Sequence, residues 1–348
     1  MVRDSMELER QFLNLLTIVE GLQKKVDQLE KENQILIRSQ KQLLEWVEQN
    51  QQDNLHFQEN VGYELRDAVD HSGNNFFPKI LDGEITIEEI VNKKKSLSRF
   101  GDGEFAVIAG RIRHRFQTEI DEELKQRLLE VLQSEEKNLL IGIADNYGSL
   151  EKYTEQAKRE IRCYLNPRVR KEHLSLLNPQ KNYYDAYVTR PYVMYADNQT
   201  DAPRKRFENL RRIWENRVCI FVEGCFTGLG VGNDLFANAG SVQRILGPAE
   251  NAFSRYKEIL EFCMKQEKNT LFLLALGPTA TVLSYDLCKA GYQAVDIGHV
   301  DLEYEWFLQG EGKRTPVEGK YNNEMREEQQ LSRIEDETYL SQIIADFS

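Results

Sequence analysis

The sequence predicts an α/β fold built on a doubly wound, mainly parallel β-sheet, with an N-terminal α-helical coiled coil before it. Two observations predict the sheet. Short, continuously apolar segments such as 138–144 and 270–276 are typical of strands buried on both faces, and helical segments alternate with them along the chain. A third observation predicts the coiled coil, because leucine recurs at every seventh position from Leu8 to Leu43.

Residues 6–50 are expected to form the coiled coil. Leucine fills one apolar position of the seven-residue repeat, and the other holds three valines together with Phe12, Asn33 and Gln40. This combination favours a parallel homodimer, because a buried asparagine fixes the register of two strands. Further apolar residues at flanking positions, among them Leu16 and Ile37, leave a trimer open. A long amphipathic helix folded back on its own domain is the other alternative.

The polar residues 51–79 predict a linker, and 80–325 are expected to be one α/β domain. Apolar spacing of three and four residues predicts its helices, and short apolar runs bounded by Gly, Pro or Asn predict its strands. In the first half we expect, in order, helix 85–94, strand 96–100, helix 122–134, strand 138–144, two helices in 150–178 separated by an Asn-Pro step, and strand 184–189.

The second half of the domain continues the alternation. Gly-Pro steps end one of its strands and open one of its helices. The expected elements are helix 204–214, strand 217–222, a short helix, strand 242–246, helix 253–266, strand 270–276, helix 280–290 and strand 293–298. Residues 326–348 are expected to be a C-terminal tail with a short helix at 339–347.

Composition restricts the class of protein. Lys plus Arg number 45 and Asp plus Glu 57, giving a formal net charge of −12. Such an acidic chain is a poor candidate for nucleic-acid binding, which depends on neutralising phosphates. The five cysteines include no CxxC pair, and there is neither a signal-peptide core nor an apolar run of membrane-spanning length. We therefore expect a cytoplasmic protein with no membrane span and no nucleic-acid partner.

In a doubly wound sheet, ligands bind in the crevice beyond the carboxyl ends of the strands. Four polar clusters follow predicted strands there. They are Asp102 with Glu104, Arg190, the glycine loop 224–234, and His299 with Asp301. We expect these clusters to converge on one binding site.

The first cluster lies in the stretch SLSRFGDGE at 96–104. Two glycines let the backbone turn sharply, so that Arg99, Asp102 and Glu104 can converge on one ligand. Paired carboxylates suit a hard divalent cation, and a guanidinium suits phosphate. Together they suggest a nucleotide-sugar site. The alternative is an ordinary Asp-Gly turn with an exposed Glu beside it.

Two glycine-containing turns follow later strands. The glycines at 228, 230 and 232 lack the spacing of a dinucleotide fingerprint, but their N–H groups could approach a diphosphate or a sugar. Asn233 and Asp234 would then bind hydroxyls, or they could simply cap the next helix. Gly277 and Thr279 form a second such turn, although an N-cap explains Thr279 equally well.

His299 ends a predicted strand, and Asp301 is the first of three acidic residues at alternate positions after it. A histidine beside carboxylates can bind a metal or exchange protons near neutral pH, although many histidines are structural. The other four histidines, His173 among them, lack such neighbours and are expected at the surface.

These motifs resemble those of the GT-D-type bacterial glycosyltransferases. The resemblance covers about 80–325 and rests on RFGDGE at 99–104, TRPY at 189–192, GVGNDL at 230–235, LGPT at 276–279 and DIGHVDLEYEW at 296–306. It implies a Rossmann-like fold and transfer of a hexose, glucose or galactose, from a UDP-sugar with Mn2+ or Mg2+. Known members extend O-linked glycans on serine-rich adhesins, which implies a glycan or glycoprotein acceptor.

The resemblance also implies roles for residues. The Asp-x-Glu motif of the family falls on Asp102 and Glu104, which would serve the metal and the donor diphosphate. We expect a metal site of Asp102, Glu104 and His299, and catalytic roles for His299, Asp301 and Glu104. The residues expected to contact the UDP-sugar are Arg99, Asp102, Arg190, Gly230, Gly232, Asn233, Asp234, Gly277 and Thr279.

Two other functions remain open from the sequence. A methyltransferase could hold S-adenosylmethionine in the same kind of glycine loop, but that cofactor would leave the Asp102 and Glu104 pair without a divalent cation to bind. A non-catalytic coiled-coil scaffold is the other, and the presence of Arg99, Asp102, Glu104 and His299 speaks against it.

Overall fold

The structure is a computed structural model that describes residues 2–72, 78–112, 116–317, 319–321 and 334–348. It divides into two compact units, Met1–Gly62 and Tyr63–Ser348, which are described separately. Among the described residues, no helix combines the length and the apolar character needed to cross a membrane.

The first unit lies within one helix, α1 (Val2–Ser72). This helix includes the segment expected to be a coiled coil and continues through 51–72, where a linker was expected, because that segment contains no proline and many residues that favour helix. From Leu15 to Leu43 the leucines of the repeat are exposed in the single chain, Leu22 at 58% and Leu29 at 63%.

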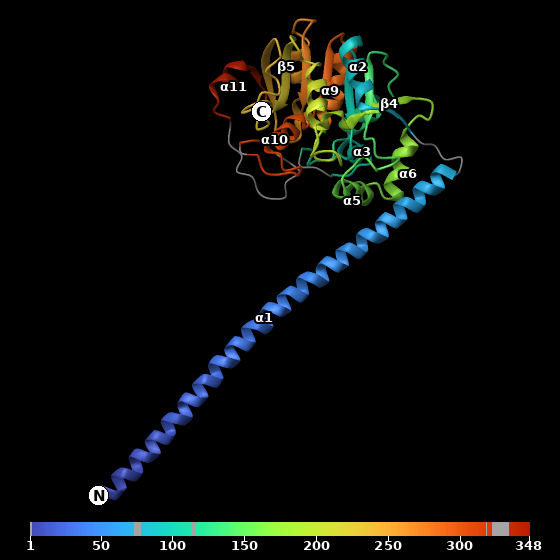
Figure 1. Cartoon of the computed structure of the whole chain (residues 1–348). Helices are drawn as coiled ribbons and strands as arrows, with labels where there is room; N and C mark the ends of the chain where they lie inside the picture. The colour runs from blue at the N-terminus through green and yellow to red at the C-terminus, as the bar shows by residue number, and fades with distance from the viewer. Residues whose placement is uncertain (1, 73–77, 113–115, 318, 322–333) are drawn as a thin grey trace. The chain divides into compact units, whose positions relative to one another are not determined.

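The second unit is built on a β-sheet, and in the described residues every strand pairs in parallel. The order across this described sheet is β1-β4-β3-β2-β8-β7-β5-β6-β9 (Figure 1). The strands are β1 (Lys79–Leu81), β2 (Ser96–Phe100), β3 (Leu139–Ile143), β4 (Asn182–Asp185), β5 (Val218–Gly224), β6 (Ser241–Gly247), β7 (Leu271–Ala275), β8 (Gln293–Asp296) and β9 (Ile343–Asp346).

Helices alternate with these strands along the chain, which confirms the doubly wound α/β class predicted from the sequence. The α-helices are α2 (Gly83–Lys93), α3 (Asp102–Ile108), α4 (Glu122–Gln133), α5 (Glu155–Tyr164), α6 (Pro167–Leu176), α7 (Ala202–Arg211), α8 (Tyr256–Cys263), α9 (Pro278–Lys289), α10 (Val300–Gln309) and α11 (Glu337–Gln342). Two 3-10 helices are η1 (Ala186–Thr189) and η2 (Ala252–Arg255).

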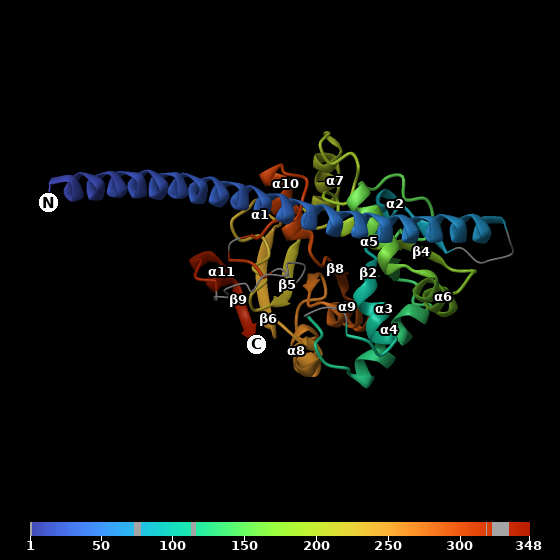
Figure 2. The same ribbon diagram turned by 90° about the horizontal axis from the view of Figure 1, so that it is seen from below.

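The sheet is buried on both faces, which explains why its strands are continuously apolar. Successive side chains of β5 enter opposite cores, Cys219 and Phe221 on one face and Ile220 and Val222 on the other. Helices α3, α4, α8 and α9 cover the face of Ile220 and Val222, and α2, α7 and α10 cover the other face (Figure 2).

Some elements differ from the sequence-based expectations. The strand expected at 184–189 ends at Asp185. The carboxylate of Asp185 accepts the N–H of Tyr187 at 2.8 Å and so caps η1, which begins at the next residue. The helix expected at 339–347 is shorter, since Ile343–Asp346 pairs with β6 as a strand. The acidic residues after His299, for which no element was expected, lie on α10.

The strand order defines where a ligand site is expected. From β2 the chain moves outward to β3 and β4, whereas β7 and β8 occupy the other side of β2. Strands β2 and β8 are neighbours, paired through Leu97 and Val295. Their carboxyl ends therefore meet where the direction of winding changes, the point at which doubly wound sheets bind ligands.

Candidate functional site

Arg99 joins the elements that meet at this point. Its Nη2 donates to Asp296 Oδ1 at 2.8 Å, its Nε to the carbonyl of Asp296 at 2.9 Å and its Nη1 to the carbonyl of Ala186 at 3.3 Å. All three nitrogens thus bind protein groups on β8 and η1. The sequence indicated a phosphate contact for Arg99. In the structure its side chain instead connects the end of β2 to the end of β8 and to η1.

Asp102 and Glu104 lie in the first turn of α3, directly after β2. Glu104 Oε2 accepts the N–H of Gly101 at 2.8 Å, which makes Glu104 part of a capping box. Asp102 Oδ1 is 3.1 Å from the N–H of Gly103. Burial raises the pKa of Glu104, the Gly101 hydrogen bond lowers it, and the negative charge of Asp296 raises it further.

The chemistry of these carboxylates fits a divalent cation. Within the described part of the chain, no group of three or more His, Cys, Asp or Glu side chains is arranged to hold an ion. Mg2+ and similar cations, however, are commonly bound by one or two carboxylates, with substrate phosphates and water supplying the other oxygens. A cation would also stabilise the charged form of Glu104, which burial and Asp296 disfavour.

Arg190 and His299 are brought together from different parts of the sheet. Arg190 follows η1, and its Nη2 is 3.2 Å from Nδ1 of His299. Because a guanidinium can only donate, Nδ1 accepts and the ring hydrogen lies on Nε2. In this arrangement His299 is a neutral hydrogen-bond donor at Nε2, which differs from the metal-ligand and base roles expected for it.

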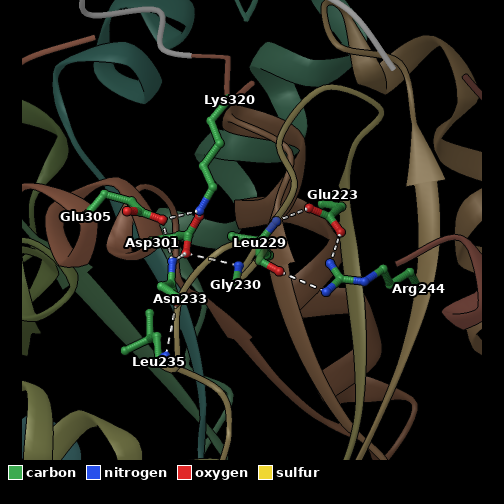
Figure 3. Close-up of polar contacts among 9 residues, drawn as sticks. All are labelled: Glu223, Leu229, Gly230, Asn233, Leu235, Arg244, Asp301, Glu305 and Lys320. Carbon is green, nitrogen blue, oxygen red and sulfur yellow. Dashed lines mark hydrogen bonds and ion pairs between the residues drawn. The ribbon is translucent and has the colours of Figure 1, made fainter. Parts of the chain in front are cut away.

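Asp301 supports the glycine loop rather than facing an open site. Its Oδ1 accepts the N–H of Gly230 at 2.9 Å and the amide of Asn233 at 2.8 Å, and its Oδ2 accepts from Lys320 at 2.6 Å (Figure 3). The N–H of Gly230, expected to approach a diphosphate, is therefore engaged by this carboxylate.

The rest of the glycine loop is held in a similar way. Glu223, fully buried at the end of β5, accepts the N–H of Leu229 at 2.7 Å and pairs with Arg244 (Figure 3). Asn233 Oδ1 accepts the N–H of Leu235 at 3.0 Å, and Asp234 accepts from the hydroxyl of Tyr304 at 2.7 Å. Gly232, with a φ of +81°, supplies a turn in the left-handed region.

The turn at Gly277 also lies close to His299. Gly277 has a φ of +53°, and a Cβ there would lie 2.9 Å from Phe116, whose ring is 5.5 Å from that of His299. Thr279 is buried in the first turn of α9, and its hydroxyl has no hydrogen-bond partner among the described residues.

Several residues at or near the site were not identified from the sequence. Glu303 accepts the N–H groups of Tyr192 at 3.1 Å and Val193 at 3.0 Å, and its position among alternating acids was a signal for it. Lys320 gave no signal, because it is a single lysine in a polar segment. His173, expected at the surface, is buried at 3% exposure.

Comparison with known proteins bears on what this arrangement does. The family described as the glycosyltransferase GT-D fold matches residues 97–325. The chain is 36% identical over 262 residues to glycosyltransferase GlyD of Streptococcus pneumoniae serotype 4, an alignment that covers 75% of this chain and 31% of that protein. It is 36% identical over 265 residues to the probable glycosyl transferase Gly of Streptococcus gordonii, covering 76% and 38%. The chain thus spans about a third of the length of these curated relatives.

Solved structures give the same result. A glycosyltransferase from Streptococcus sanguinis superposes with a TM-score of 0.73 at 34% identity, covering 78% of this chain and 100% of that one. A domain described as having a distinct glycosyltransferase fold superposes with a TM-score of 0.72 at 32% identity, covering 78% and 96%. The sequence match and these structures together show that the chain belongs to the GT-D-fold glycosyltransferase family.

Proposed function

We propose that the chain is a metal-dependent glycosyltransferase that moves a hexose from a UDP-sugar to a glycan or glycoprotein acceptor. One observation carries the proposal. In a chain of the GT-D family, Asp102 and Glu104 follow β2 and His299 follows β8, at the carboxyl ends of two neighbouring strands, and Arg190 bonds His299 there.

In this proposal Asp102 and Glu104 hold Mn2+ or Mg2+ together with the donor diphosphate. The cation would neutralise negative charge that develops on UDP as it leaves. Glu104 would contribute the carboxylate oxygen that does not accept from Gly101, so that the helix cap and the cation site coexist. Arg99 holds Asp296 and the loop after β8 in place beside this carboxylate.

Arg190 and His299 would bind the leaving UDP. A guanidinium can donate to two phosphate oxygens at once, and Arg190 also sets the ring hydrogen of His299 on Nε2. From Nε2 His299 would donate a hydrogen bond to an oxygen that gains charge as the glycosidic bond breaks. Asp301 would not contact UDP itself in this proposal, and it holds the glycine loop through the N–H of Gly230.

The assembly and the location are also part of the proposal. We propose that α1 joins two copies of the chain as a parallel coiled coil, since its repeating leucines from Leu15 to Leu43 are exposed in the single chain. Cytoplasmic location fits the cysteine content, in which no CxxC pair occurs.

The test is a screen of UDP-glucose and UDP-galactose, with S-adenosylmethionine as the competing ligand, followed by transfer assays to glycan acceptors. We expect a UDP-sugar to raise the melting temperature in the presence of Mn2+, EDTA to abolish transfer, and Mn2+ to restore it. Asp102→Ala and Glu104→Ala should each lower kcat/KM by at least about a hundredfold, as removal of a main electrostatic group does.

A matched control separates the cation site from the helix cap. Asp121 caps α4 by accepting the N–H of Leu124 at 2.8 Å, so Asp121→Ala removes a cap of the same kind from a different helix. It should cost about 1 kcal/mol of stability and leave transfer intact. Full turnover in EDTA, or an active Asp102→Ala, Glu104→Ala double variant, would show that the metal assignment is wrong.

A further inference from the structure

A buried lysine lies under the glycine loop. Lys320 is 7% exposed, and its ammonium donates to Asp301 Oδ2 at 2.6 Å and to Glu305 Oε1 at 2.7 Å (Figure 3). The same two carboxylates accept from the amide of Asn233, at 2.8 Å from Asp301 and 2.7 Å from Glu305. The Asn233 amide therefore joins the loop to α10, and the Lys320 ammonium binds the same two carboxylates of α10.

The charges of this network depend on Lys320. Asp301 and Glu305 are four residues apart on α10, so their side chains lie next to each other on one face of the helix. Like charges at this spacing repel, and burial strengthens the repulsion. The ammonium lies between them and offsets one of the two negative charges, as a bound cation would.

The network positions the backbone of the loop. Asp301 Oδ1 accepts the N–H of Gly230 at 2.9 Å, and Gly230 has a φ of +72°, so the carboxylate holds the loop at one of its left-handed turns. Asn233, the second contact, is three residues further on. Movement of Asp301 toward solvent would release Gly230 and would leave Asn233 with Glu305 alone.

The residue after Lys320 extends the connection toward His299. Tyr321 donates its backbone N–H to the carbonyl of Phe226 at 3.0 Å, near the start of the same loop. Its ring lies 5.4 Å from that of Phe116, edge to face, and Phe116 lies against His299. Tyr321 thus contacts the loop near its start and the aromatic neighbour of the histidine, while Lys320 reaches the other end of the loop only through Asp301 and Glu305.

We propose that Lys320 is a positioning residue of the donor site, whose ammonium holds the glycine loop in its binding conformation by keeping Asp301 and Glu305 together. The inference rests on the proposed function, in that the loop borders the bound UDP-sugar. Lys320 itself is placed behind Asp301 and contacts the loop only through the two carboxylates.

Removing the ammonium should affect the loop first. In Lys320→Met, the buried carboxylate of Asp301 and the partly buried one of Glu305 lose the lysine that they share, and we expect faster hydrogen exchange in a peptide covering 225–235. The KM for the UDP-sugar should rise by about tenfold or more, while kcat falls less, because leaving a buried charged group unpaired costs at least that factor. Lys320→Arg should retain most of the affinity.

Chemical rescue distinguishes positioning from a general loss of packing. Lys320→Ala leaves space where the side chain was, and methylammonium or ethylammonium in the buffer should restore protection of 225–235 and lower KM toward that of the unmodified protein. Lys313→Met is the matched control, because Lys313 lies on the same segment and pairs with Glu311 at an exposed position. It should change neither readout.

If Lys320→Met fails to fold, the double variant Lys320→Met, Glu305→Gln removes one of the two repelling charges and serves for the same measurements. Unchanged exchange at 225–235 in a folded Lys320 variant, or the absence of rescue by both amines, would overturn the proposal. Hydrogen exchange is measured without substrate. A protein that transfers no hexose at all would therefore refute the proposed function, while the exchange of 225–235 in the Lys320 variants would still test the role of Lys320.

Discussion

At the scale of single residues, His173 shows how burial decides the chemistry of a side chain. Its Nδ1 is 2.8 Å from the hydroxyl of Tyr147, its Nε2 is 3.0 Å from that of Tyr164, and its ring stacks on Phe105 at 3.9 Å. One nitrogen donates and the other accepts, so the neutral ring satisfies both hydroxyls. A second proton would remove the ring's acceptor, so the hydroxyl that donates to it would have to turn its hydrogen elsewhere and accept instead.

The protein should therefore lose stability in acid through His173. Burial lowers the pKa of His173 to about 4, and the positive charge of Arg111 adds to the effect. A lowered pKa in the folded state means that the contribution is complete above the unfolded value near 6.5 and is lost as the pH falls from there to about 4. The loss should be up to about 3 kcal/mol, measured by urea unfolding. His173→Gln should flatten this part of the pH profile and His56→Gln should not; equal profiles for the wild type and His173→Gln would contradict the prediction.

Arg190 gives a second prediction at this scale. Arg190→Lys keeps the charge but loses the planar fork and the donor to His299 Nδ1. We expect the Kd for the UDP-sugar, measured by calorimetry, to rise by about tenfold, the value of one charged hydrogen bond. Arg212→Lys, at an exposed ion pair with Glu88, is the control. An unchanged Kd in Arg190→Lys would indicate a structural role for Arg190.

The sequence singled out candidate residues for the site but not their partners. Motifs after strands pointed to Asp102, Arg190 and His299, because a parallel sheet brings the ends of its strands to one edge. The partner of Arg99 is Asp296, 197 residues away, and no local pattern encodes that pair. The same holds for Lys320, whose role depends on where a segment without regular structure lies.

At the scale of elements, predictability followed burial. Strands buried on both faces, such as β5 and β7, have a continuously apolar pattern, and this pattern identifies them as strands wherever they lie inside the sheet. The edge strand β9 does not, since its side chains are half-buried and its pairing with β6 decides its conformation. The prediction of a strand over 184–189 was wrong for a local reason, because Asp185 caps η1 and so ends the strand.

The turn between β8 and α10 offers a test of how elements hold the site. Gly298 has a φ of +45°, and a Cβ there would lie 1.9 Å from Arg99 Nη2, whereas Gly291 has a φ of +84° with nothing within 4 Å. Alanine at either position strains the backbone by about 1 kcal/mol. Gly298→Ala should also displace Arg99 from Asp296 and cost about 3 kcal/mol more, the effect of breaking a buried pair. Equal urea midpoints for the two variants would contradict this difference.

At the scale of the whole molecule, α1 is the feature that a single chain does not explain. A helix that exposes Leu22, Leu29 and Leu36 at 58%, 63% and 60% leaves a long apolar stripe in water. Soluble chains seldom expose such a stripe without a partner. The register indicates which partner, because Lys25 and Glu30 occupy the g and e positions that face each other across a parallel homodimer.

A chain of residues 63–348 should be a monomer by light scattering, while the full chain has twice the mass of one copy.

Lys25→Glu should place two glutamates opposite each other at both symmetric contacts, and we expect the dimer to dissociate about fivefold more readily at low salt. Within the helix, the residues three and four positions from Lys25 are Gly21, Leu22, Gln28 and Leu29, so the substitution changes no charge pair inside one chain. Adding Glu30→Lys should restore the affinity, because the two charges are then exchanged between the strands. An antiparallel dimer would not be rescued by the double variant, because these two positions do not face each other there. A trimer would have three times the mass of one copy, a helix packed on its own domain would leave the full chain a monomer, and a truncated chain that keeps the full-length mass ratio would exclude α1 as the interface.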